Sequence, residues 1–96
     1  MVKALSRRSI DAALKELPGW AYQDNALRKT FKCKNFREAI SWIVRMAFFA
    51  EEQNHHPELT NVYSRITVAL STHEAGGRVT ARDIRLARSI EQFSWL

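Results

Sequence analysis

Residues 35–50 read NFREAISWIVRMAFFA and carry the strongest helix signal in the chain. Asn35, followed three residues later by Glu38, resembles the capping box that begins a helix. Apolar residues then recur at helical spacing, which predicts one buried stripe: Phe36, Ala39, Ile40, Ile43, Val44, Ala47 and Ala50. Pro57 disfavours helical geometry in the residue before it, so we expect the helix to end near Asn54.

Two pairs of short strands flank this helix. Before it, a strand near residues 20–22 and an alternating strand over 27–33 enclose the turn signal Asp24-Asn25, which predicts a β-hairpin. After it, residues 60–63 and 66–72 form the second pair, and apolar residues at every other position of 66–70 predict a half-buried strand.

Helices begin and end the chain in this interpretation. Ser6 is expected to cap the first helix, which Pro18-Gly19 stops, and Thr80 with Asp83 forms a second capping box before the last helix. The order α-β-β-α-β-β-α predicts an α+β fold, with a four-stranded antiparallel sheet and helices packed on one face. We expect one domain over residues 1–96.

Composition limits the classes of protein that need to be considered. The 96 residues are 46% hydrophobic and 26% charged, as in an ordinary globular domain. No apolar run approaches the roughly 18–20 residues of a membrane span, and the early residues turn polar too soon for a signal peptide. Cys33 is the single cysteine, which excludes an intrachain disulfide, and we expect a cytoplasmic protein.

The net charge of +5 raises the possibility of a nucleic-acid partner. The basic residues are scattered along the chain, however, and no basic stripe alternates with aromatic residues. Nucleic-acid binding is therefore the weaker interpretation, and a steep loss of affinity with salt would identify it.

All three histidines fall around the second strand pair. If Ser64-Arg65 is the centre of a tight turn, antiparallel pairing places His56 opposite His73, with His55 beside them. Histidine can both give and take protons near neutral pH, so a cluster can divide the roles of acid and base. Three imidazoles could also bind zinc, but neighbouring side chains in an extended chain point to opposite faces.

Polar residues that could hydrogen-bond a polar heterocycle flank the histidines: Asn54, Ser71 and Thr72. Glu51 and Glu74 are close enough in sequence to influence the charge state of the imidazoles. The residues alone assign Asp83 mainly to helix capping.

The histidines belong to a longer pattern: Glu, three residues, His-His-Pro, five residues, Tyr, nine residues, His, nine residues, Asp. The residues that fill it are Glu51, His55, His56, Pro57, Tyr63, His73 and Asp83. With Leu17-Pro18-Gly19-Trp20 near the start and residues 83–87 near the end, the chain resembles the pterin-4a-carbinolamine dehydratases over nearly its whole length. It departs from many members at Leu59 and Thr60, where they carry aromatic residues.

The resemblance implies dehydration of 4a-hydroxytetrahydropterin to quinonoid dihydropterin, which recycles the pterin after an aromatic amino-acid hydroxylase has used it. It implies no metal and no cofactor. The counterparts of the catalytic residues are His55, His56 and His73, and pterin contacts would come from residues 54–56 and 71–74. Glu51 and Asp83 would support them. Our hypothesis is that His55 and His73 are the acid–base pair and that His56 orients the pterin.

The alternative function is a non-enzymatic one. Animal relatives in this family also act as dimerisation cofactors for a homeodomain transcription factor, and that role would use a helical face and not the histidines. A homodimer or homotetramer is expected in either case, because Met46, Phe48 and Phe49 lie off the predicted buried stripe.

Overall fold

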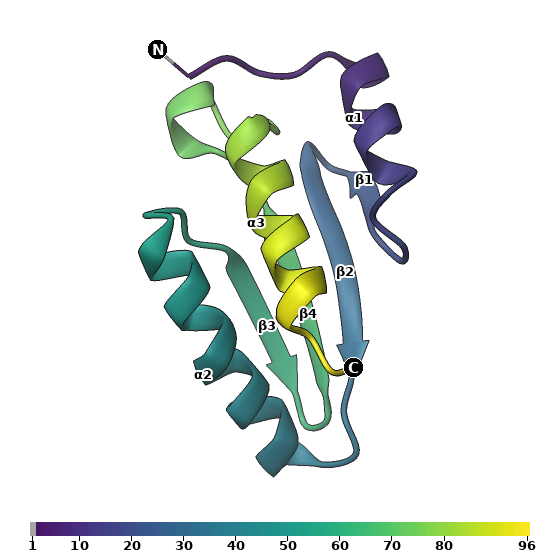
Figure 1. The fold of residues 1–96 in the computed structure, drawn as a ribbon, viewed down its shortest axis with the longest axis vertical. Helices are drawn as coiled ribbons and strands as arrows, with labels where there is room; N and C mark the ends of the chain where they lie inside the picture. Colours follow the sequence, from purple (N-terminus) through teal and green to yellow (C-terminus); the bar gives the residue numbers. More distant parts are fainter. Residues whose placement is uncertain (1) are drawn as a thin grey trace.

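A computed structural model describes residues 2–96 and confirms the predicted order of elements, with one short 3-10 turn added (Figure 1). The elements are α1 (Arg7–Leu14), β1 (Ala21–Gln23), β2 (Ala26–Lys32), α2 (Phe36–Glu52), β3 (Glu58–Val62), β4 (Arg65–Leu70), η1 (His73–Ala75) and α3 (Ala81–Phe93). The α+β prediction is therefore confirmed. Within residues 2–96, no helix is long and apolar enough to cross a membrane.

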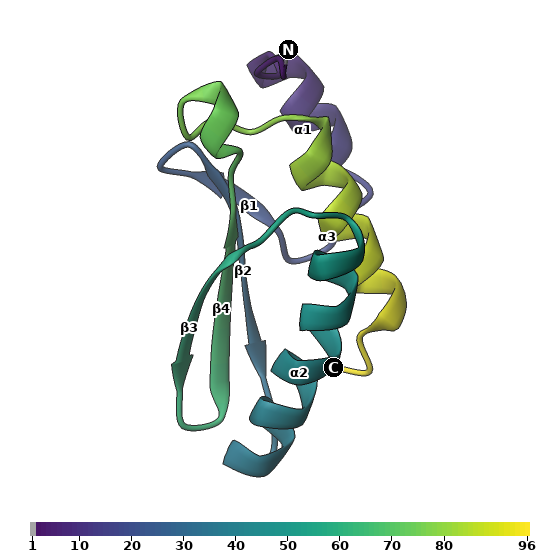
Figure 2. The same ribbon diagram turned by 90° about the vertical axis from the view of Figure 1, so that its left-hand side faces the viewer.

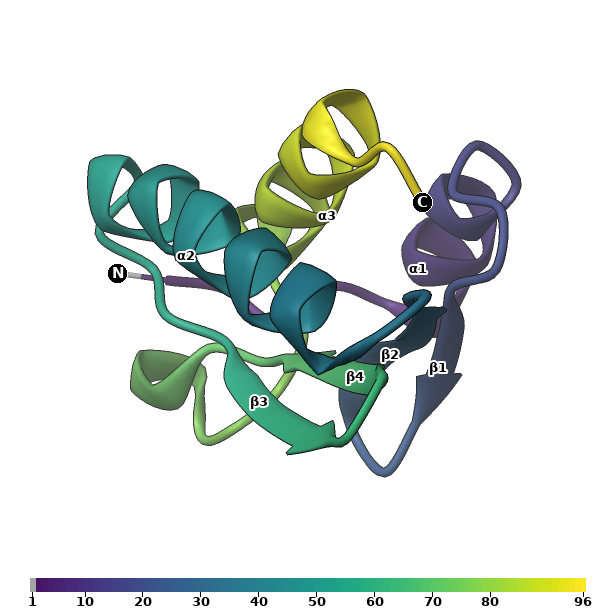
Figure 3. The ribbon, with the colours of Figure 1, turned by 90° about the horizontal axis from the view of Figure 1, so that it is seen from below.

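The four strands form one antiparallel sheet in the order β1-β2-β4-β3. The three α-helices lie on one face of this sheet, as Figures 2 and 3 show. Pairing of β2 with β4 joins the two hairpins, so β4 lies in the interior of the sheet and β3 forms an edge. Ser71 and Thr72 connect the C-terminal end of β4 to η1, which begins at His73.

Local signals explain most of the boundaries. The side chain of Ser6 caps α1, and Asp24 and Asn25 adopt φ values of 52° and 61°, the two positive angles that a type I′ hairpin turn requires. The Asn35 side chain accepts a hydrogen bond from the Glu38 N–H, as predicted. The Glu38 carboxylate, however, accepts from the Lys34 N–H, so only half of the capping box forms there.

The turn predicted for the second hairpin is one residue too late, so the predicted cross-strand partners are wrong by two residues. Leu59 pairs with Val68 and Val62 with Arg65, so the turn is Tyr63-Ser64. Tyr63 adopts φ 56°, an angle that the sequence did not indicate, because aromatic residues rarely occupy left-handed geometry. Since Glu58 pairs with Ala69, His56 falls level with Ser71 and not with His73.

The predicted buried face of α2 is only partly right. Ala39 and Ala50 of the predicted stripe are buried, but the other two buried residues of the helix are Trp42 and Met46. The larger members of the predicted stripe are exposed or half-buried: Phe36, Ile40, Ile43 and Val44. Trp42 fills the core with no exposed surface and packs against Phe31 at a ring-centroid distance of 4.5 Å. The helix has apolar residues on two faces, and the larger side chains of the Trp42 face occupy the space above the sheet.

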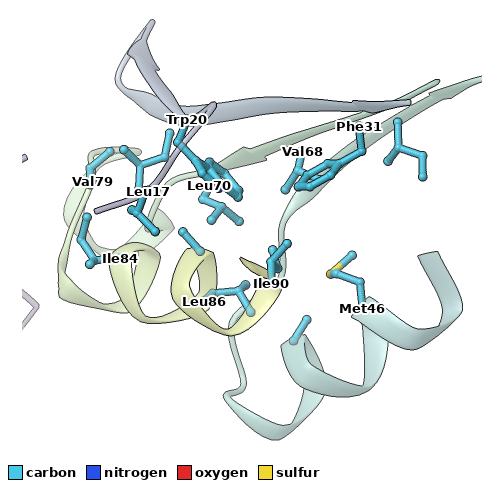
Figure 4. Close-up of a cluster of buried hydrophobic side chains, with 14 of the residues drawn as sticks. Leu17, Trp20, Phe31, Met46, Val68, Leu70, Val79, Ile84, Leu86 and Ile90 are labelled. Atoms are coloured by element: carbon cyan, nitrogen blue, oxygen red, sulfur yellow. The ribbon is translucent and has the colours of Figure 1, made fainter. Parts of the chain in front are cut away.

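The core lies between the inner face of the sheet and the helices, as Figure 4 shows. Leu17 and Trp20 close it near β1, and Leu86 and Ile90 of α3 contact the same cluster. Burial of such side chains stabilises a fold by about 1.5–3 kcal/mol each. This core fixes α2 and α3 against the sheet and thereby positions the ends of both helices near η1.

Candidate functional site

The end of α2 determines where the adjacent histidines point. Asn54 adopts a left-handed φ of 50°, its N–H donates to the Glu51 carbonyl, and the His55 N–H donates to the Ala50 carbonyl at 3.0 Å. These two bonds form a Schellman motif, which satisfies the last carbonyls of the helix and turns the chain sharply. After the turn His55 is buried and His56 is exposed.

A residue of α3, Asp83, fixes the side chain of His55. Its Nε2 lies 2.5 Å from Oδ1 of Asp83, and the side chains are 8% and 0% exposed. The other oxygen of Asp83, Oδ2, accepts from the Thr80 N–H and from the Thr72 hydroxyl, both at 2.8 Å. The hydroxyls of Thr72 and Thr80 are 2.6 Å apart. Asp83 is thus both the capping-box partner predicted from the sequence and the partner of His55.

The other two histidines are exposed. Nε2 of His56 lies 2.8 Å from Oε2 of Glu51, one helical turn back on α2. His73 begins η1, where its neighbour Glu74 is paired with Arg82 at 3.4 Å. The pKa of Glu74 lies below its ordinary value. The main cause is the hydrogen bond that the carboxylate accepts from the backbone N–H of Glu74 itself, and the positive charge of Arg82 lowers the pKa further.

All three histidines line one hollow of about 300 Å³, together with Asn54, Ser71 and Glu74. A second hollow of about 370 Å³ adjoins it and shares His56, Ser71 and His73. It continues across Pro57 and Ala69 to Asp24 and Arg28. The two hollows form a polar pocket at the end of the sheet where β4 passes into η1.

Three of the predicted site residues lie outside the lining of this pocket. Thr72 and Asp83 are completely buried behind His55, and Thr72 directs its hydroxyl to Asp83. Glu51 lies on α2, where it contacts His56. Thr72 therefore supports the pocket and does not line it.

The sequence interpretation did not place Arg28, Asp24 or Thr80 at the site. Arg28 pairs with Ala69 across β2 and β4, two strands that are distant in sequence, so no local signal places it there. Thr80 was recognised only as a helix cap, although the short spacing to Thr72 across the Gly76-Gly77 turn was available. Within residues 2–96, no group of three or more His, Cys, Asp or Glu side chains is arranged to hold a metal ion.

Comparison with known proteins relates this chain to one family. The family model described as pterin 4 alpha carbinolamine dehydratase matches residues 3–93. The chain belongs to this family. A member from Opitutus terrae, named a putative pterin-4-alpha-carbinolamine dehydratase, is 53% identical over the whole of this chain and 99% of its own length. Another with the same name, from Rhodopseudomonas palustris, is 50% identical over 94% of this chain and 90% of its own.

A solved structure agrees with the fold of this pterin-4-alpha-carbinolamine dehydratase family member. The crystal structure of a transcriptional coactivator/pterin dehydratase from Brucella melitensis superposes with a TM-score of 0.86 and 36% sequence identity. The match covers 93% of this chain and 96% of that one. The name of that protein combines the two functions that the sequence interpretation left as alternatives.

Proposed function

We propose that this family member dehydrates a 4a-hydroxytetrahydropterin to a quinonoid dihydropterin and water. The observation that carries the proposal is the pocket lined by His55, His56 and His73. Hollows of about 300 and 370 Å³ that adjoin are within the range of small-molecule sites, and the polar lining suits a heterocycle rich in nitrogen and oxygen.

The reaction needs two proton transfers. The bond from C4a to the hydroxyl oxygen breaks as that oxygen receives a proton and leaves as water. A ring N–H loses its proton, and its electron pair forms the new C=N bond. Positioned acids and bases typically accelerate such steps by about 10²–10⁴-fold, and imidazole is suited to both roles near neutral pH.

The contacts of the histidines support a division of labour. His55 is buried and fixed by Asp83, so it meets the substrate in one orientation. His73 reaches the same hollow from η1, on the other segment of the pocket. We assign His55 and His73 as the acid–base pair, and His56, which is exposed and paired with Glu51, as the residue that orients the pterin.

Polar residues of the lining complete the assignment. Asn54, Ser71 and Glu74 line the hollow with the histidines and are proposed as pterin contacts. The carboxylate of Glu74 can accept hydrogen bonds from the amino group and ring N–H of a pterin, and its lowered pKa favours that charged form.

The direct test is a dehydratase assay in which the 4a-hydroxytetrahydropterin is generated in situ. The protein should exceed the spontaneous rate by at least 100-fold, at the lower end of the range for acid–base catalysis. A chelator should leave that rate unchanged. Free imidazole at the same concentration is the control for unpositioned buffer catalysis. A wild-type rate equal to the spontaneous rate would reject the proposal.

The exposed face of α2 favours a second proposal, that the chain forms a homo-oligomer. Phe36, Ile40, Val44 and Phe48 follow one another at four-residue spacing and are 49%, 39%, 53% and 72% exposed. A continuous apolar stripe of this kind usually marks a contact surface. The same stripe is the surface on which a coactivator-like role would depend, and light scattering at micromolar concentration distinguishes a monomer from an oligomer.

A further inference from the structure

We propose that Thr72 and Thr80 act as positioning residues for His55, through a directed chain of hydroxyl hydrogen bonds that ends on Asp83. These hydrogen bonds hold His55 as the tautomer with hydrogen on Nε2. Nδ1 is then the nitrogen that exchanges a proton with the substrate. The catalytic part of this inference rests on the proposed dehydratase function, whereas the tautomer is a property of the protein without substrate.

The direction of the chain follows from counting hydrogens. Thr72 donates its single hydroxyl hydrogen to Oδ2 of Asp83. It therefore has none left for Thr80, so the 2.6 Å contact between the two hydroxyls is a bond from Thr80 to Thr72. The Thr80 oxygen in turn accepts from the Arg82 N–H. Each of the two hydroxyls thus donates to one fixed partner and accepts from another.

Asp83 receives donors on both oxygens. Oδ2 accepts the Thr72 hydroxyl and the Thr80 N–H, and a backbone N–H can only donate. Two donors on Oδ2 stabilise the carboxylate, so the proton shared with the imidazole stays on Nε2 of His55. Among the described residues, no side-chain partner occupies Nδ1 of His55, and His55 lines the pocket.

Burial makes this arrangement difficult to replace. Thr72, Thr80 and Asp83 are 0%, 1% and 0% exposed, so water does not substitute for a lost hydroxyl without rearrangement. An unpaired polar group in such a position is costly. By contrast, the hydroxyls of Thr30 and Thr67 form a similar pair at 3.1 Å on an exposed part of the sheet.

The experiment compares Thr72→Val, which removes the hydroxyl at nearly constant volume, with Thr72→Ser, which keeps it. Thr67→Val, on β4 and five residues before Thr72, is the matched control. Long-range ¹H–¹⁵N spectra of the histidine rings report the tautomer of His55, and the dehydratase assay gives kcat and KM. Circular dichroism verifies that each variant is folded.

We expect the Nε2–H tautomer for His55 in the wild-type protein and in Thr72→Ser. Thr72→Val should show a mixture of tautomers and a kcat lowered about 10-fold with little change in KM, because Thr72 does not touch the pterin. Thr67→Val should match the wild type. An Nδ1–H tautomer of His55 in the wild-type protein would overturn the proposal, even if Thr72→Val failed to fold.

The proposal would also be overturned if Thr72→Val folded and kept the wild-type tautomer of His55 and the wild-type kcat. A wild-type protein without dehydratase activity would reject the proposed function instead, and the tautomer measurement would still decide the role of the hydroxyl chain.

Discussion

An Asp83→Asn substitution replaces one carboxylate oxygen with an NH₂ group in a site where both oxygens accept hydrogen bonds. If the NH₂ group takes the place of Oδ2, it faces the Thr80 N–H, which can only donate. If it takes the place of Oδ1, it faces Nε2 of His55, which can accept by moving its hydrogen to Nδ1. The second orientation is the cheaper one, so we expect the variant to reverse the tautomer of His55.

The magnitude follows from the three contacts that Asp83 makes. A hydrogen bond to a charged group contributes about 1.5–3 kcal/mol and a neutral one about 0.5–1.5 kcal/mol. The variant converts three charge-assisted bonds into neutral ones, a loss of about 1 kcal/mol each. The free energy of unfolding should therefore fall by roughly 3 kcal/mol.

Urea unfolding measures the stability, and the dehydratase assay measures kcat. We expect kcat to fall by at least about 10-fold, because the hydrogen moves to the nitrogen that faces the substrate. Asp11→Asn is the matched control: Asp11 is exposed and pairs with Arg7 on the surface, so its loss should change stability by about 0.5 kcal/mol or less. If Asp83→Asn behaved like Asp11→Asn in both measurements, the reasoning about this carboxylate would be refuted.

Three further predictions concern the surroundings of the site. Phe48→Asp should reduce the mass measured by light scattering, because Phe48 is 72% exposed on the apolar stripe of α2; an unchanged mass would contradict oligomerisation through this face. Asn54→Ala should lower the free energy of unfolding by about 1 kcal/mol and Asn54→Gly by much less, because φ is 50° there; equal stability of the two variants in urea would contradict the role of the turn. The pKa of Glu74 is lowered in the folded state, so its contribution to stability is present above the unfolded pKa and is lost as pH falls through the folded value. Arg82→Gln should raise the Glu74 titration midpoint toward 4.5 in an NMR titration, and a constant midpoint would exclude Arg82 as a cause.

The two hairpins differ in how far their sequences predict them. The residue types of Asp24 and Asn25 predict the first turn, because both residues tolerate positive φ and both adopt it. Tyr63-Ser64 does not predict the second turn, since a tyrosine at φ 56° is held there by the strands and not by its own preference. Placing the turn one residue too late moved the expected partner of His56 by two residues, from Ser71 to His73, although the histidines still line one pocket.

Helix α2 shows a different limit. Periodicity identified the helix and its caps, but the helix has two apolar faces and the sequence does not say which of them meets the sheet. The structure buries the face that contains Trp42 and Met46 and exposes the one that contains Phe36 and Val44. The choice depends on the space between Phe31 on β2 and Phe93 on α3, which both contact Trp42, and Phe93 lies far from α2 in sequence.

The site itself was predictable where its residues are adjacent in sequence. Asn54, His55 and His56 follow from the helix end, and Thr80 with Asp83 follows from the capping box. The contact between His55 and Asp83 joins segments 28 residues apart, and the position of Arg28 depends on pairing between β2 and β4. Such long-range contacts follow from the assembled sheet and are not visible in local patterns.

The central claim is that the histidines of this pocket catalyse dehydration, and it is tested most directly by replacing His55 and His73 together with alanine. The catalysed rate of the in situ assay should fall by about 10²–10⁴-fold. Gln92→Ala, on an exposed position of α3, should retain the wild-type rate. A folded His55→Ala/His73→Ala variant that still accelerated dehydration as well as the wild type would contradict the claim.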